Sequence, residues 1–228
     1  MVHTEGCAAA GVAGIAGRMR ELDSRWPARD GVAVFNRVYL AVTEEIGRRI
    51  DAGEFPDPRA ATVLDVLFAG RYLAAVAAVD TGARPPACWR PLFQYRHHPG
   101  IRPFQFALAG VNAHIGHDLA LAVVDSCRAL ECAPADLEDE FDRVGDILAL
   151  LEERVREELM PGPDLLELAD PLTHLAGAWS LDRARDAAWS AARVLWRIRD
   201  LAPLADEFTE RMDLGVGLVG RCLLTPWS

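Results

Sequence analysis

One long apolar segment, residues 104–124, constrains the fold of this chain more than any other feature of its sequence. Its only strongly polar side chains are Gln105, Asn112, His114, His117 and Asp118. Alanine and leucine dominate and β-branched clusters are scarce, which favours helix over strand. We therefore expect one helix over about 103–131, opened by Pro103. Because this helix is apolar on nearly all sides, we expect neighbouring elements to bury it. A membrane-spanning helix rarely carries two histidines and an aspartate.

Further helices are predicted along the rest of the chain from caps, breakers and apolar spacing. Their expected ranges are about 8–24, 31–51, 58–79, 136–159, 173–199 and 203–223, with a short helical turn at 89–95. Asp30, Asp57 and Asp136 are the predicted N-caps of three of them. No strand signal or internal repeat is present, and 228 residues fit one domain. The sequence thus predicts an all-α, single-domain bundle of about seven helices around the central buried helix.

Charge and cysteine content exclude several classes of function. The net charge is -10, so a phosphate backbone or an anionic membrane surface would repel the chain. We expect neither nucleic acid nor membrane as a partner. The five cysteines include no C-x-x-C pair, which indicates neither a disulfide framework nor a zinc knuckle. The alanine- and glycine-rich start lacks a preceding basic region, so we expect no signal peptide and a cytoplasmic location.

Two familiar patterns are interpreted as packing features. Gly215, Gly217 and Gly220 match G-x-G-x-x-G, but no βαβ unit surrounds them, so we expect them to let helices approach closely. The helix over 173–199 carries three tryptophans, which we assign to the core, and several arginines. We expect those arginines to pair with the acidic helix over 136–159.

The polar residues of the central helix form the candidate site. His114 and Asp118 are one turn apart and share a face, and His117 lies three positions after His114. A carboxylate beside an imidazole fixes its tautomer and raises its basicity, which suits a general base or a supported metal ligand. The same pair also suits a purely structural hydrogen-bond network. The spacing alone does not decide between these interpretations.

Two other helices also present polar side chains in apolar surroundings. Asp65 stands almost alone in its helix, so a cation, a metal or a hydrogen-bond donor must meet it, with Arg71, Arg96, Arg102 and His114 as candidates. Polar lines on three helices favour the walls of one pocket. We therefore predict His114, Asp118 and Asp65 as catalytic residues. The predicted substrate-binding residues are Asn112, Tyr72, Asn36, Tyr39 and Gln105.

A more specific interpretation of the same site is that its residues bind a divalent metal ion. His114, His117, Asp118 and Asp65 are the candidate ligands, joined by Glu44 or by the loop residues His97 and His98. No H-E-x-x-H or E-x-x-H signature is present, so no cofactor is predicted and a divalent metal stays an alternative.

A run of sequence, A-G-V-N-A-H-I-G-H-D-L-A-L-A-V over residues 109–123, resembles domain-of-unknown-function family 5995, an uncharacterised and largely actinobacterial family. Phe35, Asn36 and Tyr39 before it and the segment 217–224 near the end extend the resemblance over roughly 30–224, with 1–29 as an N-terminal helix and linker. The N-A-H-I-x-x-D-L pattern points to Asn112, His114 and Asp118. The resemblance also implies a role for Asp65, but it brings no established activity.

Three functions follow as hypotheses, and whether the chain is an enzyme stays open. The first is a small-molecule enzyme, a cyclase, isomerase or hydrolase of bacterial specialised metabolism, in which His114 transfers a proton and Asp118 orients it. The second is a metal-dependent helical hydrolase that uses the same residues as ligands. The third is a non-catalytic binding or scaffold protein whose acidic helix docks a partner or a second copy, as in a homodimer.

Overall fold

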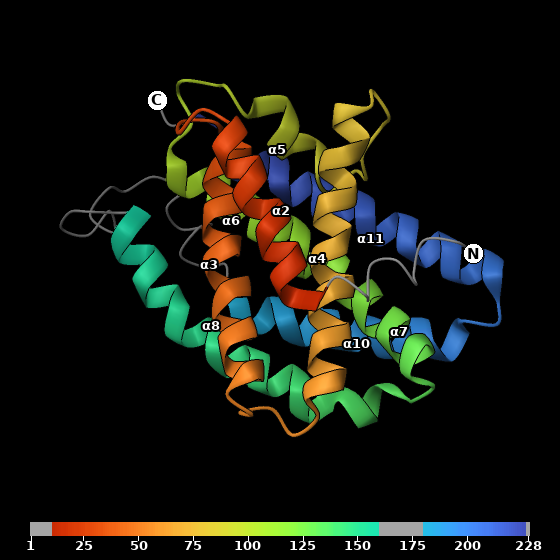
Figure 1. The fold of residues 1–228 in the computed structure, drawn as a ribbon. Coiled ribbons are helices and arrows are strands. Elements are labelled where there is room, and N and C mark those ends of the chain that lie inside the picture. The colour runs from red at the N-terminus through yellow and green to blue at the C-terminus, as the bar shows by residue number, and fades with distance from the viewer. Residues whose placement is uncertain (1–10, 160–179, 227–228) are drawn as a thin grey trace.

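A continuous rod of three helical segments runs through the centre of the molecule. The computed structural model describes residues 11–159 and 180–226, with side chains described for 11–148 and 180–226 (Figure 1). The rod consists of α6 (Pro103–Ala113), the π-helical segment η1 (His114–Asp118) and α7 (Leu119–Leu130). The central helix predicted over about 103–131 is therefore confirmed in its extent. Its five-residue π-helical middle was not predicted.

Every regular element in the described ranges is helical, which confirms the all-α fold. Besides the rod, these elements are α2 (Gly11–Arg25), α3 (Gly31–Asp51), α4 (Pro58–Asp80), α5 (Arg90–Tyr95), η2 (Pro134–Leu137), α8 (Glu138–Leu159), α10 (Leu181–Ile198) and α11 (Ala202–Leu223). Figure 1 shows α2, α3 and α4 running roughly side by side, with α8 crossing their lower ends and α11 behind. The rod packs against α3, α4, α10 and α11, so it is enclosed as its composition predicts.

Local capping chemistry sets where two of the long helices begin. The Asp30 carboxylate accepts hydrogen bonds from the backbone N–H groups of Val32 and Ala33 at the start of α3. Asp57 does the same at the start of α4, where Pro58 occupies the first helical position. Both predicted N-caps are confirmed, because each carboxylate satisfies donors that the helix itself leaves unpaired.

Two predicted helix starts are wrong. Asp136 lies inside the short 3₁₀ helix η2, where its carboxylate accepts from Ala133 N at 2.8 Å, and α8 begins two residues later at Glu138. Ser180 adopts an extended conformation (φ -122°, ψ 127°) and caps α10, so one helix cannot run through it from residue 173. The part of that prediction before residue 180 lies outside the described residues. In both cases a nearby side-chain cap outweighs helix propensity.

Two glycines let the backbone of one element touch another. A Cβ at Gly110 on α6 would lie 2.2 Å from the Phe35 ring of α3, and one at Gly217 on α11 would lie 2.6 Å from the Ala87 carbonyl oxygen. Both distances are far below carbon contact distance, so only glycine fits. The prediction that the glycines of the G-x-G-x-x-G pattern let two helices approach is wrong at Gly217, which lets α11 approach the turn at Ala87 and Cys88 before α5, and at Gly215, which faces open space. A Cβ at Gly220 would make ordinary contacts with Pro91 of α5 and Asn112 of α6.

The arginine-rich helix α10 meets the acidic helix α8 through one buried side chain. The Arg185 guanidinium donates to the Phe141 carbonyl oxygen and lies 4.6 Å from the centre of the Phe141 ring. Trp189 packs on the same ring at 4.5 Å, and Trp196 also lies against the core. The two helices touch, but the predicted pairing of arginines with carboxylates of α8 is wrong at Arg185, which uses a carbonyl and a ring, and at Arg199, which pairs with its neighbour Asp200.

Within residues 11–159 and 180–226, two helical stretches are long and apolar enough to cross a membrane. They are Pro58–Asp80 and Pro103–Leu130, and 50% and 83% of their most apolar windows are buried inside the protein. Mostly buried core helices pass the same test of length and composition. The two stretches therefore carry little weight for a membrane location.

Candidate functional site

The π-helical segment places three ionisable side chains at the middle of the molecule. The Leu119 N–H donates to the His114 carbonyl five residues earlier, which is the π-helical hydrogen bond. His114, His117 and Asp118 expose only 2%, 5% and 2% of their surface. Segments of this kind occur inside α-helices and frequently lie at functional sites. The sequence-predicted pair therefore lies where the backbone itself departs from the regular helix.

Asp118 lies between the two histidines. Its Oδ2 accepts from Trp89 Nε1 at 2.9 Å and lies 3.1 Å from His114 Nδ1, while its Oδ1 lies 2.8 Å from His117 Nδ1. Burial alone would raise the pKa of Asp118, but the hydrogen bonds from both histidines outweigh it and hold the pKa below its usual value. An ionised carboxylate only accepts, so each histidine carries a proton on Nδ1 and turns Nε2 away from Asp118.

His114 is enclosed by aromatic rings. Its imidazole stacks on Phe68 with ring centres 3.6 Å apart and planes 7° apart, and it meets Tyr39 at 4.4 Å. Its Nε2 is buried and has no hydrogen-bond partner among the described residues. Burial lowers the pKa of His114 although Asp118 acts in the opposite direction. His114 is therefore a neutral imidazole with an unused acceptor.

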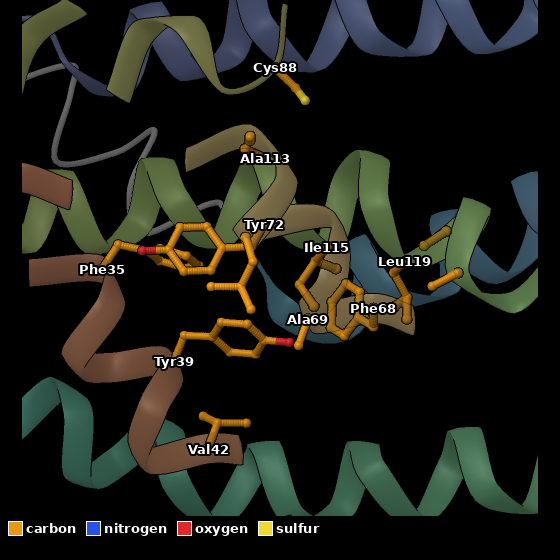
Figure 2. Packing of buried hydrophobic residues seen from close by; sticks show 14 of the residues in the cluster. Phe35, Tyr39, Val42, Phe68, Ala69, Tyr72, Cys88, Ala113, Ile115 and Leu119 are labelled. Carbon is orange, nitrogen blue, oxygen red and sulfur yellow. The ribbon is translucent and has the colours of Figure 1, made fainter. Parts of the chain in front are cut away.

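Asp65 and Tyr39 also bury polar atoms without partners. Neither Asp65 Oδ2 nor Tyr39 Oη has a partner within hydrogen-bonding distance in the described part of the chain, although the Thr43 side chain lies near the Tyr39 hydroxyl and acts to lower its pKa. Burial raises the pKa of Asp65 to about 7. Burial also raises the pKa of Tyr39, and the Asp65 and Asp118 carboxylates raise it further, so the hydroxyl lies within electrostatic reach of both. Figure 2 shows the Tyr39 ring reaching from α3 toward Phe68 and Ala69 of α4.

The cations predicted to meet Asp65 bind other carboxylates. Arg71 forms an ion pair with Asp125, and Arg96 donates to Asp30 at 2.7 Å. Because these arginines are paired elsewhere, neither compensates the burial of the Asp65 carboxyl, and burial raises its pKa.

Four of the predicted substrate-binding residues take part in hydrogen bonds that join elements of the fold. Tyr72 donates to Asn36 Oδ1 at 3.1 Å, and Asn36 donates to the Met19 carbonyl at 3.0 Å, which links α4, α3 and α2. Asn112 donates to the Val216 carbonyl on α11, and Gln105 donates to the carbonyls of Leu223 and Thr225. The structure brings Tyr39 next to His114, whereas Gln105 and Asn112 fasten α11 to the rod.

The additional metal ligands considered from the sequence lie elsewhere. Glu44 accepts from the Arg20 side chain at 2.9 Å. The His97 side chain is 72% exposed and lies 3.5 Å from Asp30, and His98 bonds the Gly100 N–H. None of these three contacts the cluster around Asp118.

The structure adds three residues that sequence reasoning missed. Trp89 donates to Asp118, as described above, and Cys88 precedes it in the chain. Asp213 on α11 accepts from the backbone N–H groups of Ala87 and Cys88 at 2.7 and 2.8 Å, and its Oδ1 lies 3.9 Å from His117 Nε2. Burial, and then the charges of Asp118 and Asp213, raise the pKa of the Cys88 thiol above its usual range. Its sulfur therefore lies beside two carboxylates.

The fold and the cluster together define an all-α bundle with a buried carboxylate held between two histidines. The model of a family of unknown function, DUF5995, matches residues 12–226, and the chain belongs to this family. The resemblance found over roughly 30–224 is thereby confirmed and reaches into α2. No curated protein and no solved structure matches the chain.

Proposed function

We propose that this chain is a small-molecule enzyme in which His114 removes and returns a proton. One observation carries the proposal: Tyr39 Oη, Asp65 Oδ2 and His114 Nε2 are all buried without partners. They come from three different elements; the Tyr39 ring contacts His114, and the charge of Asp65 is close enough to Tyr39 to raise its pKa. Each such atom costs about 1–3 kcal/mol of stability. A ligand that bonds these atoms explains why the fold retains them.

The groups divide into a base and two donors. His114 is neutral because burial lowers its pKa, so Nε2 can accept a proton. The negative charge of Asp118, 3.1 Å from Nδ1, then stabilises the imidazolium that forms. Tyr39 keeps its hydroxyl proton because its pKa is raised, and Asp65 carries a proton below pH about 7. Both can donate a hydrogen bond to an oxygen of the substrate.

A carbonyl compound with an acidic C–H bond fits this arrangement. His114 Nε2 takes the proton from carbon, the electron pair moves to the carbonyl oxygen, and Tyr39 and Asp65 hold that oxygen. Return of the proton to a different carbon gives an isomerisation. If the carbanion carbon instead attacks a second carbonyl carbon of the same molecule, the C=O π bond opens, its oxygen takes the proton back from His114, and the product is a ring. The rings of Phe35, Phe68 and Trp89 around His114 favour a substrate with an apolar body. All three polar atoms are covered, so covering side chains must move when it binds.

The expected setting belongs to the same proposal. The net charge of -10 argues against nucleic acid and anionic membranes as partners, and we propose a cytoplasmic enzyme of bacterial specialised metabolism.

A second candidate is a non-catalytic scaffold. It is favoured by the hydrogen bonds of Asn36, Tyr72, Gln105 and Asn112, which join elements of the fold. In that case the His114–Asp118 contact only stabilises the bundle, and His114→Gln changes stability without removing any reaction.

Deuterium exchange separates the two candidates. Wild-type protein is incubated in D₂O with a panel of cyclic and aromatic ketones, and mass spectrometry measures deuterium at the carbon beside the carbonyl. We expect exchange that His114→Gln lowers by about 100-fold or more. Ser126→Ala is the matched control, because Ser126 also buries an unpartnered hydroxyl but lies two turns beyond Asp118. No exchange with any ketone, or equal exchange in both variants, contradicts the proposal.

A further inference from the structure

Three side chains of different chemistry meet on the other side of Asp118. Cys88, His117 and Asp213 each offer one ligand atom, and these atoms lie within 4.8 Å of one another. Within 11–148 and 180–226 they form the one group of three such ligands. In Figure 2 the Cys88 sulfur lies beyond Ala113, apart from the rings of Tyr39 and Phe68. We propose that this cluster binds one divalent cation of the zinc type.

The spacing of the three atoms suits a tetrahedral cation. Ligand atoms about 2.0–2.3 Å from zinc lie about 3.3–3.8 Å from each other. His117 Nε2 and Asp213 Oδ1 are already 3.9 Å apart. The other two pairs lie no more than 4.8 Å apart, so shifts of up to about half an ångström by each side chain close the site around a cation.

Hydrogen bonds hold both the His117 ring and the Asp213 carboxylate in a fixed orientation. His117 donates its Nδ1 proton to Asp118 Oδ1 at 2.8 Å, which directs the Nε2 lone pair toward Asp213. A carboxylate behind a ligating histidine is a common support of metal sites. The Asp213 carboxylate is fixed by the N–H groups of Ala87 and Cys88, and each oxygen keeps a lone pair for a cation.

Packing brings the ligands together from three distant segments. Cys88 precedes α5, His117 lies in η1, and Asp213 lies on α11 one turn before Gly217. The missing side chain of Gly217 lets α11 approach the Ala87 carbonyl, which seats Asp213 on the backbone of residues 87 and 88. A cation would join these three segments to one another.

Charge and ligand type select the cation. A thiolate and a carboxylate neutralise a charge of +2, and the histidine adds none, so a bound divalent cation leaves no net charge among the ligands. On binding, the Cys88 thiol gives its proton to solvent and its sulfur bonds the cation. A sulfur, a nitrogen and an oxygen ligand suit zinc or cobalt and not magnesium or calcium. Three protein ligands also leave a fourth position for water or a substrate oxygen.

Zinc and cobalt binding to the intact chain test the inference. Protein stripped with a chelator is titrated with Zn²⁺ and, separately, with Co²⁺. We expect about one ion per chain for each. The cobalt form should show the near-ultraviolet charge-transfer absorption of a cobalt–thiolate bond. Because this spectrum is recorded on the wild-type chain, it remains decisive even if a variant fails to fold. Less than about a tenth of an ion per chain, or bound cobalt without that absorption, would overturn the inference.

Matched variants assign the ligands. Cys88→Ser should remove the cobalt–thiolate absorption and weaken Zn²⁺ binding by about 100-fold or more, whereas Cys127→Ser, which alters another fully buried cysteine, should change neither. Asp118→Asn should weaken Zn²⁺ binding by about 10–100-fold, because it removes the support of His117. Zn²⁺ binding equal to wild type in Cys88→Ser contradicts the assignment.

Discussion

The two histidines bound to Asp118 lie in opposite surroundings. Each faces the carboxylate through Nδ1, so each presents Nε2 to a different side of the rod. Nε2 of His114 is enclosed by aromatic rings and has no partner, whereas Nε2 of His117 lies 3.9 Å from a carboxylate oxygen. One carboxylate thus orients two identical side chains in different surroundings. The surroundings make the first suited to accept a proton and the second suited to accept a cation.

Replacing the shared Asp118 carboxylate should disturb its contacts with His114 and with His117 at the same time. Asp118→Asn replaces an acceptor of three N–H groups by an amide that must turn its own NH₂ toward one of them. We expect the free energy of unfolding to fall by about 3–5 kcal/mol in urea titrations, because hydrogen bonds to a charged acceptor become weaker bonds to a neutral one and one buried N–H donor is left facing the amide NH₂. Asp125→Asn is the control. Asp125 lies one heptad later and pairs with Arg71 at the half-exposed surface, so the loss should stay below about 1 kcal/mol. Equal losses would show that Asp118 has no special role.

The Asp65 carboxyl should make the free energy of unfolding of the chain depend on pH. Its pKa is about 7 in the folded chain and near 3.8 when unfolded, so only the unfolded chain releases this proton between those values. Stability from this group is therefore present below pH about 4 and lost as pH rises toward about 7. The Asp65→Asn variant has no carboxyl at this position, so it does not lose this stability as pH rises. Its free energy of unfolding relative to wild type should therefore increase by about 1–1.4 kcal/mol per pH unit across this window and then level off.

Urea titrations at several pH values measure this difference. Asp200→Asn, at a carboxylate whose side chain is 85% exposed, should show no such slope. A stability difference for Asp65→Asn that stays flat from pH about 4 to about 7 would mean that Asp65 is ionised in the folded chain.

A methyl group at Gly217 should disturb the proposed cation site at His117 and leave the surroundings of His114 unchanged. Its carbon would lie 2.6 Å from the Ala87 carbonyl oxygen, so α11 must move away and carry Asp213 with it. We expect Gly217→Ala to lower the free energy of unfolding by about 1–3 kcal/mol. Zn²⁺ binding should weaken with it, and ketone exchange at His114 should not change.

Gly215→Ala is the matched change at the same helix, since a methyl group there meets open space. It should stabilise the chain by about 0.5–1 kcal/mol, because alanine favours a helix over glycine. Destabilisation by both variants would mean that helix α11 does not lie as described.

Variants of two tyrosines that differ in hydrogen bonding should show the smallest changes in stability and test the most specific part of the proposal. Tyr39→Phe removes a hydroxyl without a partner, so stability should stay level or rise by about 1 kcal/mol, while ketone exchange falls. Tyr72→Phe removes the bond to Asn36 and should cost about 1 kcal/mol without lowering exchange. Thermal unfolding and the exchange assay measure both variants. A stability loss in Tyr39→Phe would mean that its hydroxyl is bonded within the fold.

Features set by neighbours in the sequence were predictable, and features set by distant contacts were not. Asp30 and Asp57 could be recognised because an N-cap depends on the next three residues. The rod could be recognised because its composition leaves no polar face. The π-helical segment left no such signal, since an extra residue in a helix that is apolar all round does not interrupt any stripe. His114 and Asp118 stand four apart in either kind of helix.

The partners of the site residues depend on the tertiary fold. Asp213 lies far from Cys88 and His117 in the sequence, and only the close approach at Gly217 joins them. The three glycines of α11 were the available signal, because they predict that something packs closely there. Asp65 was expected to meet a cation, but Arg71 and Arg96 are drawn to Asp125 and Asp30. Which of several nearby arginines pairs with which carboxylate cannot be read from spacing.

The π-helical hydrogen bond also has a consequence for insertions and deletions. A segment of this kind is an α-helix that has gained one residue, and each residue of an α-helix turns the chain by about 100°. Losing one residue between 114 and 118 would rotate all of α7 against α4 and α10, which pack on it. The same loss would leave His114 and Asp118 three residues apart, still on one face but at a different angle to each other. The His114–Asp118 geometry and the packing of α7 therefore change together when a residue is lost here.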